Sequence, residues 1–178
     1  MGMNDPGEIA HLTDIAEPTV GLVNNAQREH QEFMASVAAV AEENGAVIRG
    51  LGDAGAAIFP GDEQYTALWR SYAGKRTIHT FGLGASCDIS AQWQAEDFGS
   101  QIKIITPNTQ FNVQLSAAGV HNVRNALAAC AAAMSVGINA DSIVRGLENF
   151  APVAGRLQRK TAANGALVID DTYNANPD

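Results

Sequence analysis

The chain has 178 residues, of which 46% are hydrophobic and 17% charged, and these values predict one folded domain, or one domain plus a fragment, with a sizeable core. Its formal net charge of −8 argues against a nucleic-acid partner, although a few local donors and a metal can still hold a nucleotide. Cys87 and Cys130 lack metal-ligand spacing, the start of the chain is polar, and no apolar stretch approaches membrane-spanning length. We therefore expect a cytoplasmic protein with reduced thiols and no membrane insertion.

The first half of the chain alternates strand and helix signals. Short β-type stretches are predicted at 19–23, 56–59 and 77–81. A helical spacing of apolar residues ends at Gly45, and a short helix contains Leu68 and Trp69. Strands separated by helices of this length predict an α/β fold with a mostly parallel sheet flanked by helices.

The middle of the chain changes character. Three β-type stretches, at 89–95, 102–105 and 111–115, follow one another without a helical pattern between them. Turn-forming residues separate the three stretches. This order predicts a small antiparallel β meander.

Helical patterns return after Gly119 and again after Asn139, which is placed to cap the second helix. The inward residues expected of that second helix are Ile143, Val144, Leu147 and Phe150. The last two stretches, 157–160 and 166–169, flank Asn164-Gly165 and predict a hairpin.

Four polar clusters interrupt these elements, and each has a simple structural explanation. Asn122 at a helix start can serve as a cap, and His30 near another helix start can be a surface residue. Arg156 follows a loop glycine and can be solvated, whereas Asp171 can begin a turn. The terminal cluster nevertheless follows a strand-like stretch, and ligands of α/β proteins gather at the carboxyl ends of strands.

Taken in order, the four clusters resemble the Mur ligases. The matching motifs are Asn-Asn-x4-His, His-Asn-x-x-Asn-Ala-Leu-Ala-Ala, Gly-Arg-Leu and Asp-Asp-Thr-Tyr-Asn-Ala-Asn-Pro. The last motif is most similar to the branch that adds D-alanyl-D-alanine to UDP-N-acetylmuramoyl-tripeptide. The resemblance implies an ATP-dependent ligase of peptidoglycan precursor synthesis in the bacterial cytoplasm, acting through an acyl phosphate.

The resemblance also implies roles for single residues. Asn122 and Asn125 would bind adenine, Arg156 the ATP phosphates, and Asp171 the ribose hydroxyls. His30 would be a ligand of Mg²⁺. Three more residues would line the join to the next domain, namely Tyr173, Asn174 and Asn176.

The chain departs from the family pattern at the phosphate loop and at a position of the second metal site. No Gly-Lys-Thr or Gly-Lys-Ser phosphate loop occurs in these 178 residues. Asn44 falls near the position where many members carry a carbamylated lysine, and an asparagine cannot be carbamylated. We therefore expect a partial chain that lacks activity alone, with residues 1–160 as the latter part of the central ATPase domain. Residues 161–178 would form a linker hairpin and the start of the C-terminal Rossmann-like domain, and both neighbouring domains would be partners.

Two other functions fit the same residues. Another ligase of the Mur and folylpolyglutamate synthase superfamily would share the order of clusters. A non-catalytic α/β module that binds a nucleotide or a protein partner would explain why the phosphate loop is absent.

Overall fold

The structure is a computed structural model that describes residues 1–3, 5–27, 36–151, 158–170 and 172. Its strands are β1 Val20–Leu22, β2 Ala56–Pro60, β3 Thr77–Phe81, β4 Ser90–Glu96, β5 Gly99–Ile105, β6 Gln110–Leu115, β7 Gln158–Thr161 and β8 Leu167–Asp170. Its helices are α1 Glu8–Ala16, α2 Val37–Asn44, α3 Ala46–Arg49, α4 Thr66–Ala73, α5 Val120–Ser135 and α6 Ala140–Glu148. Among the described residues, no helix is long and apolar enough to cross a membrane.

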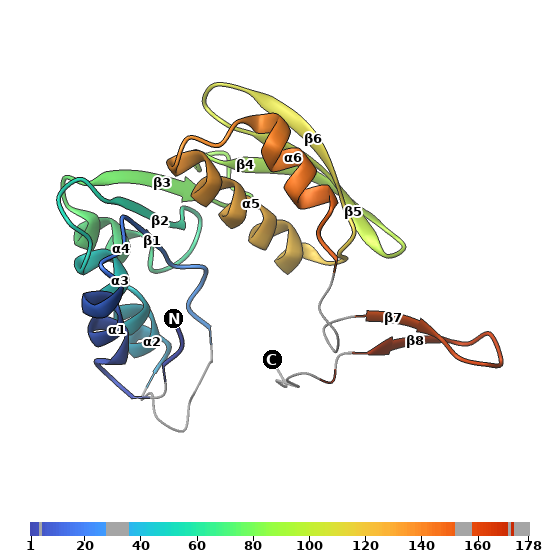
Figure 1. Cartoon of the computed structure of the whole chain (residues 1–178), viewed down its shortest axis with the longest axis horizontal. Helices are drawn as coiled ribbons and strands as arrows, with labels where there is room; N and C mark the ends of the chain where they lie inside the picture. The colour runs from blue at the N-terminus through green and yellow to red at the C-terminus, as the bar shows by residue number, and fades with distance from the viewer. Residues whose placement is uncertain (4, 28–35, 152–157, 171, 173–178) are drawn as a thin grey trace.

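A parallel sheet in the order β1-β2-β3 forms the centre of the α/β body, as predicted. The central strand β2 is buried along its whole length because helices cover both faces of the sheet. Ile58 packs in the cluster on the α5 side, whereas Ala57 and Phe59 pack with α3 and α4 on the other side. Figure 1 shows α5 on one face of this sheet and the group α1 to α4 on the other.

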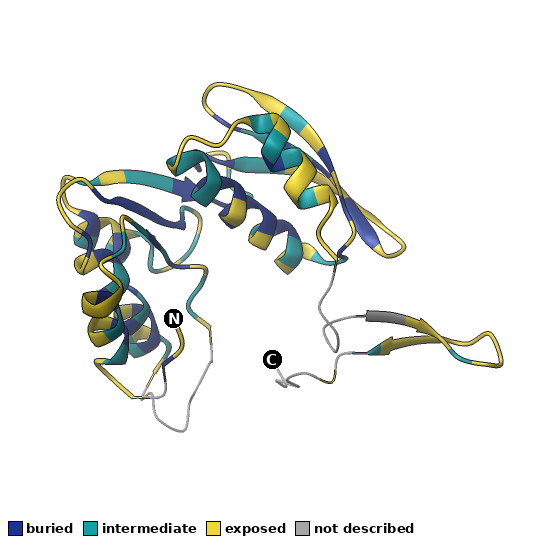
Figure 2. Ribbon diagram, in the orientation of Figure 1, coloured by how far each residue is buried: buried dark blue, intermediate teal, exposed yellow. Residues whose placement is uncertain are grey.

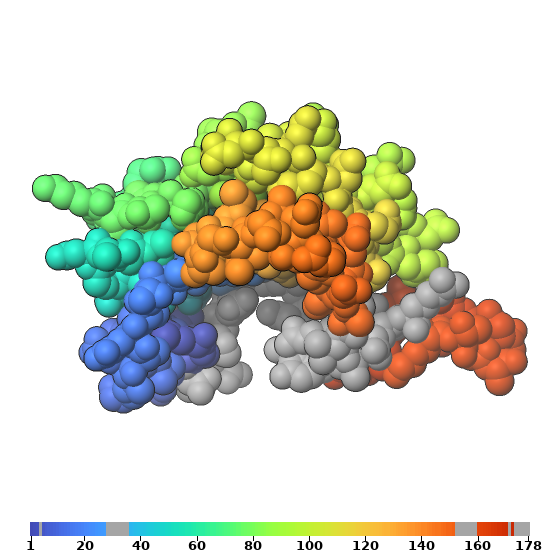
Figure 3. All heavy atoms as spheres, turned by 45° about the horizontal axis from the view of Figure 1, so that its top comes forward, coloured from blue at the N-terminus to red at the C-terminus, as the bar shows by residue number. Residues whose placement is uncertain are grey.

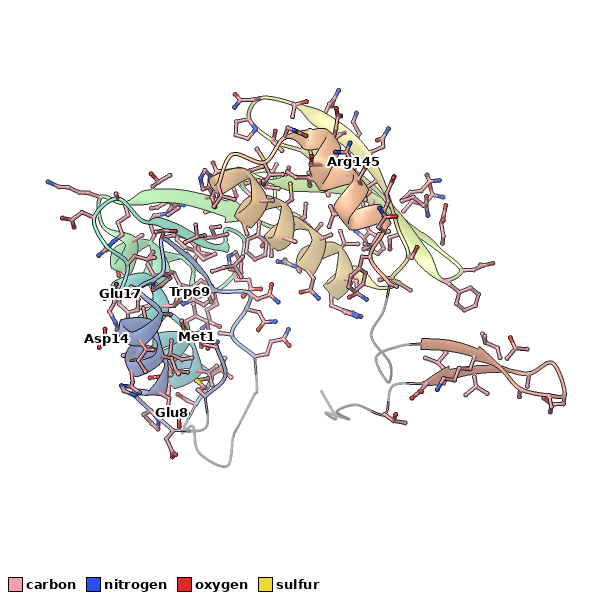
Figure 4. All side chains as sticks on the ribbon, viewed as in Figure 1. Met1, Glu8, Asp14, Glu17, Trp69 and Arg145 are labelled. Carbon is pink, nitrogen blue, oxygen red and sulfur yellow. The ribbon has the colours of Figure 1, made fainter. Side chains whose placement is uncertain are left out.

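The α4 side of the sheet is organised around Trp69. This side chain is completely buried, and the stick view shows it between the sheet and the helices (Figure 4). Its indole Nε1 donates to the Ala41 carbonyl at 2.9 Å. The ring centroids of Phe59 and Tyr65 lie 6.3 and 6.2 Å from that of Trp69. The predicted short helix at this position is therefore confirmed.

The antiparallel meander β4-β5-β6 is also confirmed. One of its faces carries Ile102, Ile104, Val113 and Leu115 into the same cluster as α5, so the meander and the parallel sheet share a core. Helix α6 lies against β6, and Glu148 accepts a hydrogen bond from the Gln114 backbone at 3.3 Å. In the space-filling view the orange atoms of α6 lie across the yellow atoms of the meander (Figure 3).

The connection from α5 to α6 follows the predicted capping signals. Gly137 adopts φ +81° and donates to the Met134 carbonyl, while Ile138 donates to Ala133 at 3.0 Å. This pair of bonds satisfies the last carbonyls of α5. The Asn139 side chain then accepts from the Ser142 amide at 2.9 Å and caps α6.

The sequence patterns missed two helices. Helix α1 begins without a local side-chain cap. Instead, Glu43 of α2 accepts hydrogen bonds from the amides of Gly7 and Ile9, both at 3.0 Å. Gly45 ends α2 as expected, but it stays in the right-handed helical region and leads directly into α3. Helix α1 was missed because its cap is distant in sequence, and α3 was missed because it has only four residues.

The predicted C-terminal hairpin is confirmed where it is described. Strands β7 and β8 pair in antiparallel register, with Gly165 at φ +81° in the turn. Lys160 forms an ion pair with Asp170. The hairpin extends away from the layered body, and its exposed β8 contrasts with the buried β2 (Figure 2).

Candidate nucleotide site

Polar residues gather where the parallel strands end, beside the first turns of α5. Asn24 follows β1, Asp62 follows β2, and Leu83 and Gly84 follow β3. Hydrogen bonds connect these loops to one another and to α5. The carboxyl edge of the sheet is where α/β proteins bind ligands.

Asn24 and Asn125 connect the end of β1 with α5 across 101 residues of sequence. The Asn24 Nδ2 donates to Asn125 Oδ1 at 2.9 Å. The backbone before Asn24 is held by the sheet, since the Val23 amide donates to the Ile58 carbonyl at 2.9 Å. The partner of Asn125 therefore sits at a fixed place.

Asn122 does not cap α5, which corrects the simple structural explanation of this residue. The N-cap is Gly119, with no side-chain cap, and Asn122 lies within the first turn of the helix. Its Nδ2 donates to the Ala118 carbonyl at 2.7 Å and lies 3.1 Å from His121 Nε2. Among the described residues, none donates a hydrogen bond to the side-chain oxygen of Asn122.

A cavity of about 500 Å³ lies between α5 and α6, and both asparagines line it. The rest of its lining is mostly apolar and includes Ile143, Leu147 and Phe150. Phe150 was expected to point inward, but it follows the end of α6 and is 44% exposed, so that prediction was wrong. Its ring borders an open cavity instead of filling the core.

Asp62 anchors the neighbouring part of the site. It accepts both arms of the Arg124 guanidinium, at 3.0 and 2.9 Å, and the amides of Leu83 and Gly84 at 2.9 and 3.0 Å. Burial opposes ionisation, but these hydrogen bonds outweigh it and lower the pKa of Asp62. The close approach requires a glycine at position 82, where an added Cβ would lie 2.3 Å from Asp62 Oδ1.

Glu63 has the opposite electrostatic balance. Its carboxylate lies 3.7 Å from Arg124, which is too far for a strong hydrogen bond. Burial raises the pKa of Glu63 despite the positive charge of Arg124, and the nearby Asp62 raises it further. One arginine therefore fully serves only one of two adjacent carboxylates.

Only part of the predicted site falls on described residues. Asn122 and Asn125 lie together at the cavity. The other predicted site residues lie outside the described residues, namely His30, Arg156, Asp171, Tyr173, Asn174 and Asn176. Asn44 is described, and its Nδ2 donates to the Asn25 carbonyl at 3.1 Å.

Sequence reasoning missed Asp62 and Arg124 as parts of this region. Asp62 stands two residues beyond a buried strand, and the strand-end rule applied to the terminal motif could have found it. Arg124 lies within the polar cluster at the start of α5, but nothing in the sequence names its partner.

The described residues contain no group of three or more His, Cys, Asp or Glu side chains placed to hold a metal ion. Cys87 and Cys130 are free and buried, and burial raises the pKa of both thiols, that of Cys130 to about 11. Such thiols are poor nucleophiles at neutral pH.

Comparison with known proteins identifies this architecture. A family profile described as "Mur ligase middle domain" matches residues 1–133. The chain belongs to the Mur ligase family. Its relatives include the UDP-N-acetylmuramoyl-tripeptide–D-alanyl-D-alanine ligases of Escherichia coli, 38% identical, and Bacillus subtilis, 32% identical. Each match covers 99% of this chain but only 39% and 38% of the relative's length.

Solved structures agree with the sequence match. MurF from Acinetobacter baumannii superposes with a TM-score of 0.94 at 34% identity, covering 99% of this chain and 39% of that one. MurF from Thermotoga maritima, solved in complex with ADP, gives a TM-score of 0.83 at 26% identity. That match covers 98% of this chain and 40% of the other. The Mur ligase fold of the chain is thus established.

Proposed function

We propose that this chain supplies the adenine side of the ATP site in a Mur ligase that adds D-alanyl-D-alanine to UDP-N-acetylmuramoyl-tripeptide. The observation that carries the proposal is the convergence of Asn122 and Asn125 on the cavity between α5 and α6. The proposed substrates are those stated in the names of the relatives from E. coli and B. subtilis. The ADP complex of the T. maritima relative supports the nucleotide.

The cavity fits a purine base. It is large enough, mostly apolar, and carries a small number of polar groups, which is the usual make-up of a ligand pocket. Ile143 and Leu147 offer apolar surface to the faces of the ring, and the two amides offer a donor and an acceptor to its edge. This combination holds an aromatic base in one orientation.

In this proposal the residues outside the described part complete the nucleotide site. Arg156 neutralises charge on the transferring phosphoryl group, and Asp171 accepts hydrogen bonds from the ribose hydroxyls. Tyr173, Asn174 and Asn176 face the following domain. His30 is a ligand of Mg²⁺ in this proposal.

The proposed reaction has two steps. The γ-phosphoryl group of ATP passes to the terminal carboxylate of the tripeptide, which releases ADP and leaves an acyl phosphate. The amine of D-alanyl-D-alanine then attacks the acyl carbon and phosphate leaves. We assign residues 1–160 to the central domain and 161–178 to the linker hairpin and the start of the C-terminal domain. The UDP-sugar and C-terminal domains are the expected partners in the bacterial cytoplasm.

Calorimetric titration with Mg-ATP tests the nucleotide part of the proposal. We expect a dissociation constant of about 1 mM or weaker, because the sequence contains no phosphate loop to add contacts. Asn125→Ala should abolish the signal, and Asn112→Ala on the exposed meander should leave it unchanged. Binding that survives loss of Asn125, or no adenine-dependent binding, would contradict the proposal.

A hybrid enzyme tests the substrates. The chain replaces the matching segment of the E. coli relative, and phosphate release is measured with UDP-N-acetylmuramoyl-tripeptide and D-alanyl-D-alanine. Release that requires both substrates and is lost with Asn125→Ala supports the assignment. A folded hybrid that binds ADP without such release would contradict the assignment of substrates.

A further inference from the structure

We propose that Asn24 is a positioning residue that orients the amide of Asn125 so that Asn125 offers a hydrogen-bond donor to a ring nitrogen of the bound base. This inference rests on the proposed function, since it takes adenine as the occupant of the cavity between α5 and α6. Asn24 itself is not among the residues that line this cavity. It acts through Asn125.

The first step of the argument is the bond between the two asparagines. An asparagine amide can present either its oxygen or its NH₂ group to a ligand, and a fixed partner decides which. The Asn24 Nδ2 donates to Asn125 Oδ1 at 2.9 Å. Within the described part of the chain, no protein group accepts a hydrogen bond from the NH₂ group of Asn125, so this group is available to the cavity.

The second step is the complementary orientation of Asn122. Its NH₂ group donates to the Ala118 carbonyl at 2.7 Å, and a carbonyl can only accept. The same nitrogen lies 3.1 Å from His121 Nε2, which accepts its second proton when the imidazole carries its own proton on Nδ1. The oxygen of Asn122, to which no described residue donates, therefore remains as an acceptor.

The third step is the geometry of α5. Residues three apart on a helix lie on one face, and both Asn122 and Asn125 border the same cavity. The pair thus presents one acceptor and one donor side by side. Adenine carries an exocyclic amine that donates next to ring nitrogens that accept, and this edge matches the pair.

Substitution of Asn24 by aspartate reverses the arrangement. A carboxylate can only accept, so Asn125 must turn its NH₂ group toward position 24 and its oxygen toward the base. An oxygen then faces a ring nitrogen, where two lone pairs repel. Asn24→Ala removes the constraint without adding charge and leaves Asn125 free to adopt both orientations.

The test is an NMR titration of the whole chain with ADP and with three analogues in which N1, N3 or N7 is replaced by CH. We expect Asn24→Asp to weaken ADP binding about tenfold and Asn24→Ala about threefold. One analogue should bind the unmodified chain about tenfold more weakly than ADP and be insensitive to Asn24→Asp. Gln27→Glu, the same chemical change at an exposed position three residues away, should alter nothing.

The outcomes separate the inference from the proposed function. Equal weakening of ADP and all three analogues by Asn24→Asp, or no weakening at all, overturns the positioning role while the nucleotide site stands. If the unmodified chain shows no ADP-dependent shifts at the side-chain amides of Asn122 and Asn125, the proposed function and this inference both fail. The role is supported if the tenfold preference for ADP over the insensitive analogue disappears in Asn24→Asp and becomes smaller in Asn24→Ala.

Discussion

The layered body and the β7–β8 hairpin use their apolar residues in opposite ways. In β2 every residue is buried between helices on two faces. In β8, Leu167, Val168 and Ile169 are 46, 45 and 57% exposed. Both regions have regular strand pairing, so pairing alone does not distinguish them.

This difference shows which region carries the stability of the chain. Burial of apolar surface is the main favourable contribution to folding, and a two-stranded hairpin without it is marginal in water. We therefore expect the body to unfold as a cooperative unit and the hairpin to open at much lower free energy. The candidate nucleotide site belongs to the stable region, because Asn24 and Asp62 directly follow β1 and β2 of the body and Asn125 lies on α5.

The largest effect is expected from Trp69. Trp69→Ala should lower the free energy of unfolding by about 3–5 kcal/mol, because it empties the core under α4 and removes the bond to Ala41. Ile169→Ala in the hairpin should change it by less than about 0.5 kcal/mol. Urea unfolding monitored by far-UV circular dichroism, which does not rely on tryptophan fluorescence, measures both free energies. If both substitutions lowered the free energy of unfolding by similar amounts, the body and the hairpin would not differ in their contribution to stability.

The next effect concerns the long-range cap of α1. Glu43→Ala should cost about 2 kcal/mol, since it leaves the amides of Gly7 and Ile9 without their acceptor. Glu42→Ala, at the adjacent exposed position, is the matched control and should be nearly neutral. If both variants unfold at the same urea concentration, Glu43 does not act as a cap.

A smaller, pH-dependent effect separates Asp62 from Glu63. The lowered pKa of Asp62 means that its contribution is present above the unfolded-state pKa and is lost as the pH falls through the folded-state pKa. Asp62→Asn should therefore cost about 1 kcal/mol at pH 7 and less at pH 3. Thermal unfolding at the two pH values measures this difference.

Glu63 should behave in the opposite sense. Its raised pKa means that the folded state binds the proton more tightly, so stability falls as the pH rises from the unfolded-state pKa to the folded-state pKa. Glu63→Gln should thus raise the melting temperature slightly at pH 7 relative to pH 4. A decrease at pH 7 would show that the contact with Arg124 outweighs burial.

The smallest effect on the whole chain is expected from the hairpin turn. Gly165 has φ +81°, a conformation that alanine adopts only with strain. Gly165→Ala should speed hydrogen exchange at the Ala162 amide, which donates to Ala166 at 2.9 Å, and leave the urea transition of the body unchanged. A shift of the body's transition would mean that the two regions are coupled.

Much of the body could be predicted from sequence because its signals are local. The strands 56–59 and 77–81, the meander and the Asn139 cap each follow from neighbouring residues. Helix α1 could not be predicted in this way, since its cap is Glu43. Phe150 has the right helical spacing but lies past the end of α6.

The candidate site was predicted less completely, because several of its contacts join residues that are distant in sequence. Asn122 and Asn125 stand in one motif, and their place at the cavity agrees with the predicted adenine role without testing it. The hydrogen bond from Asn24 and the ion pair between Asp62 and Arg124 join residues 101 and 62 positions apart. Only the folded sheet brings such partners together.

The most direct test of the nucleotide site is an intermolecular NOE experiment on the methyl-labelled chain with ADP. The proposed site predicts NOEs from the adenine protons to the methyl groups of Ile143 and Leu147, which line the cavity beside Asn122 and Asn125. NOEs to the residues along the edge of β1, or none to α6, would contradict the site.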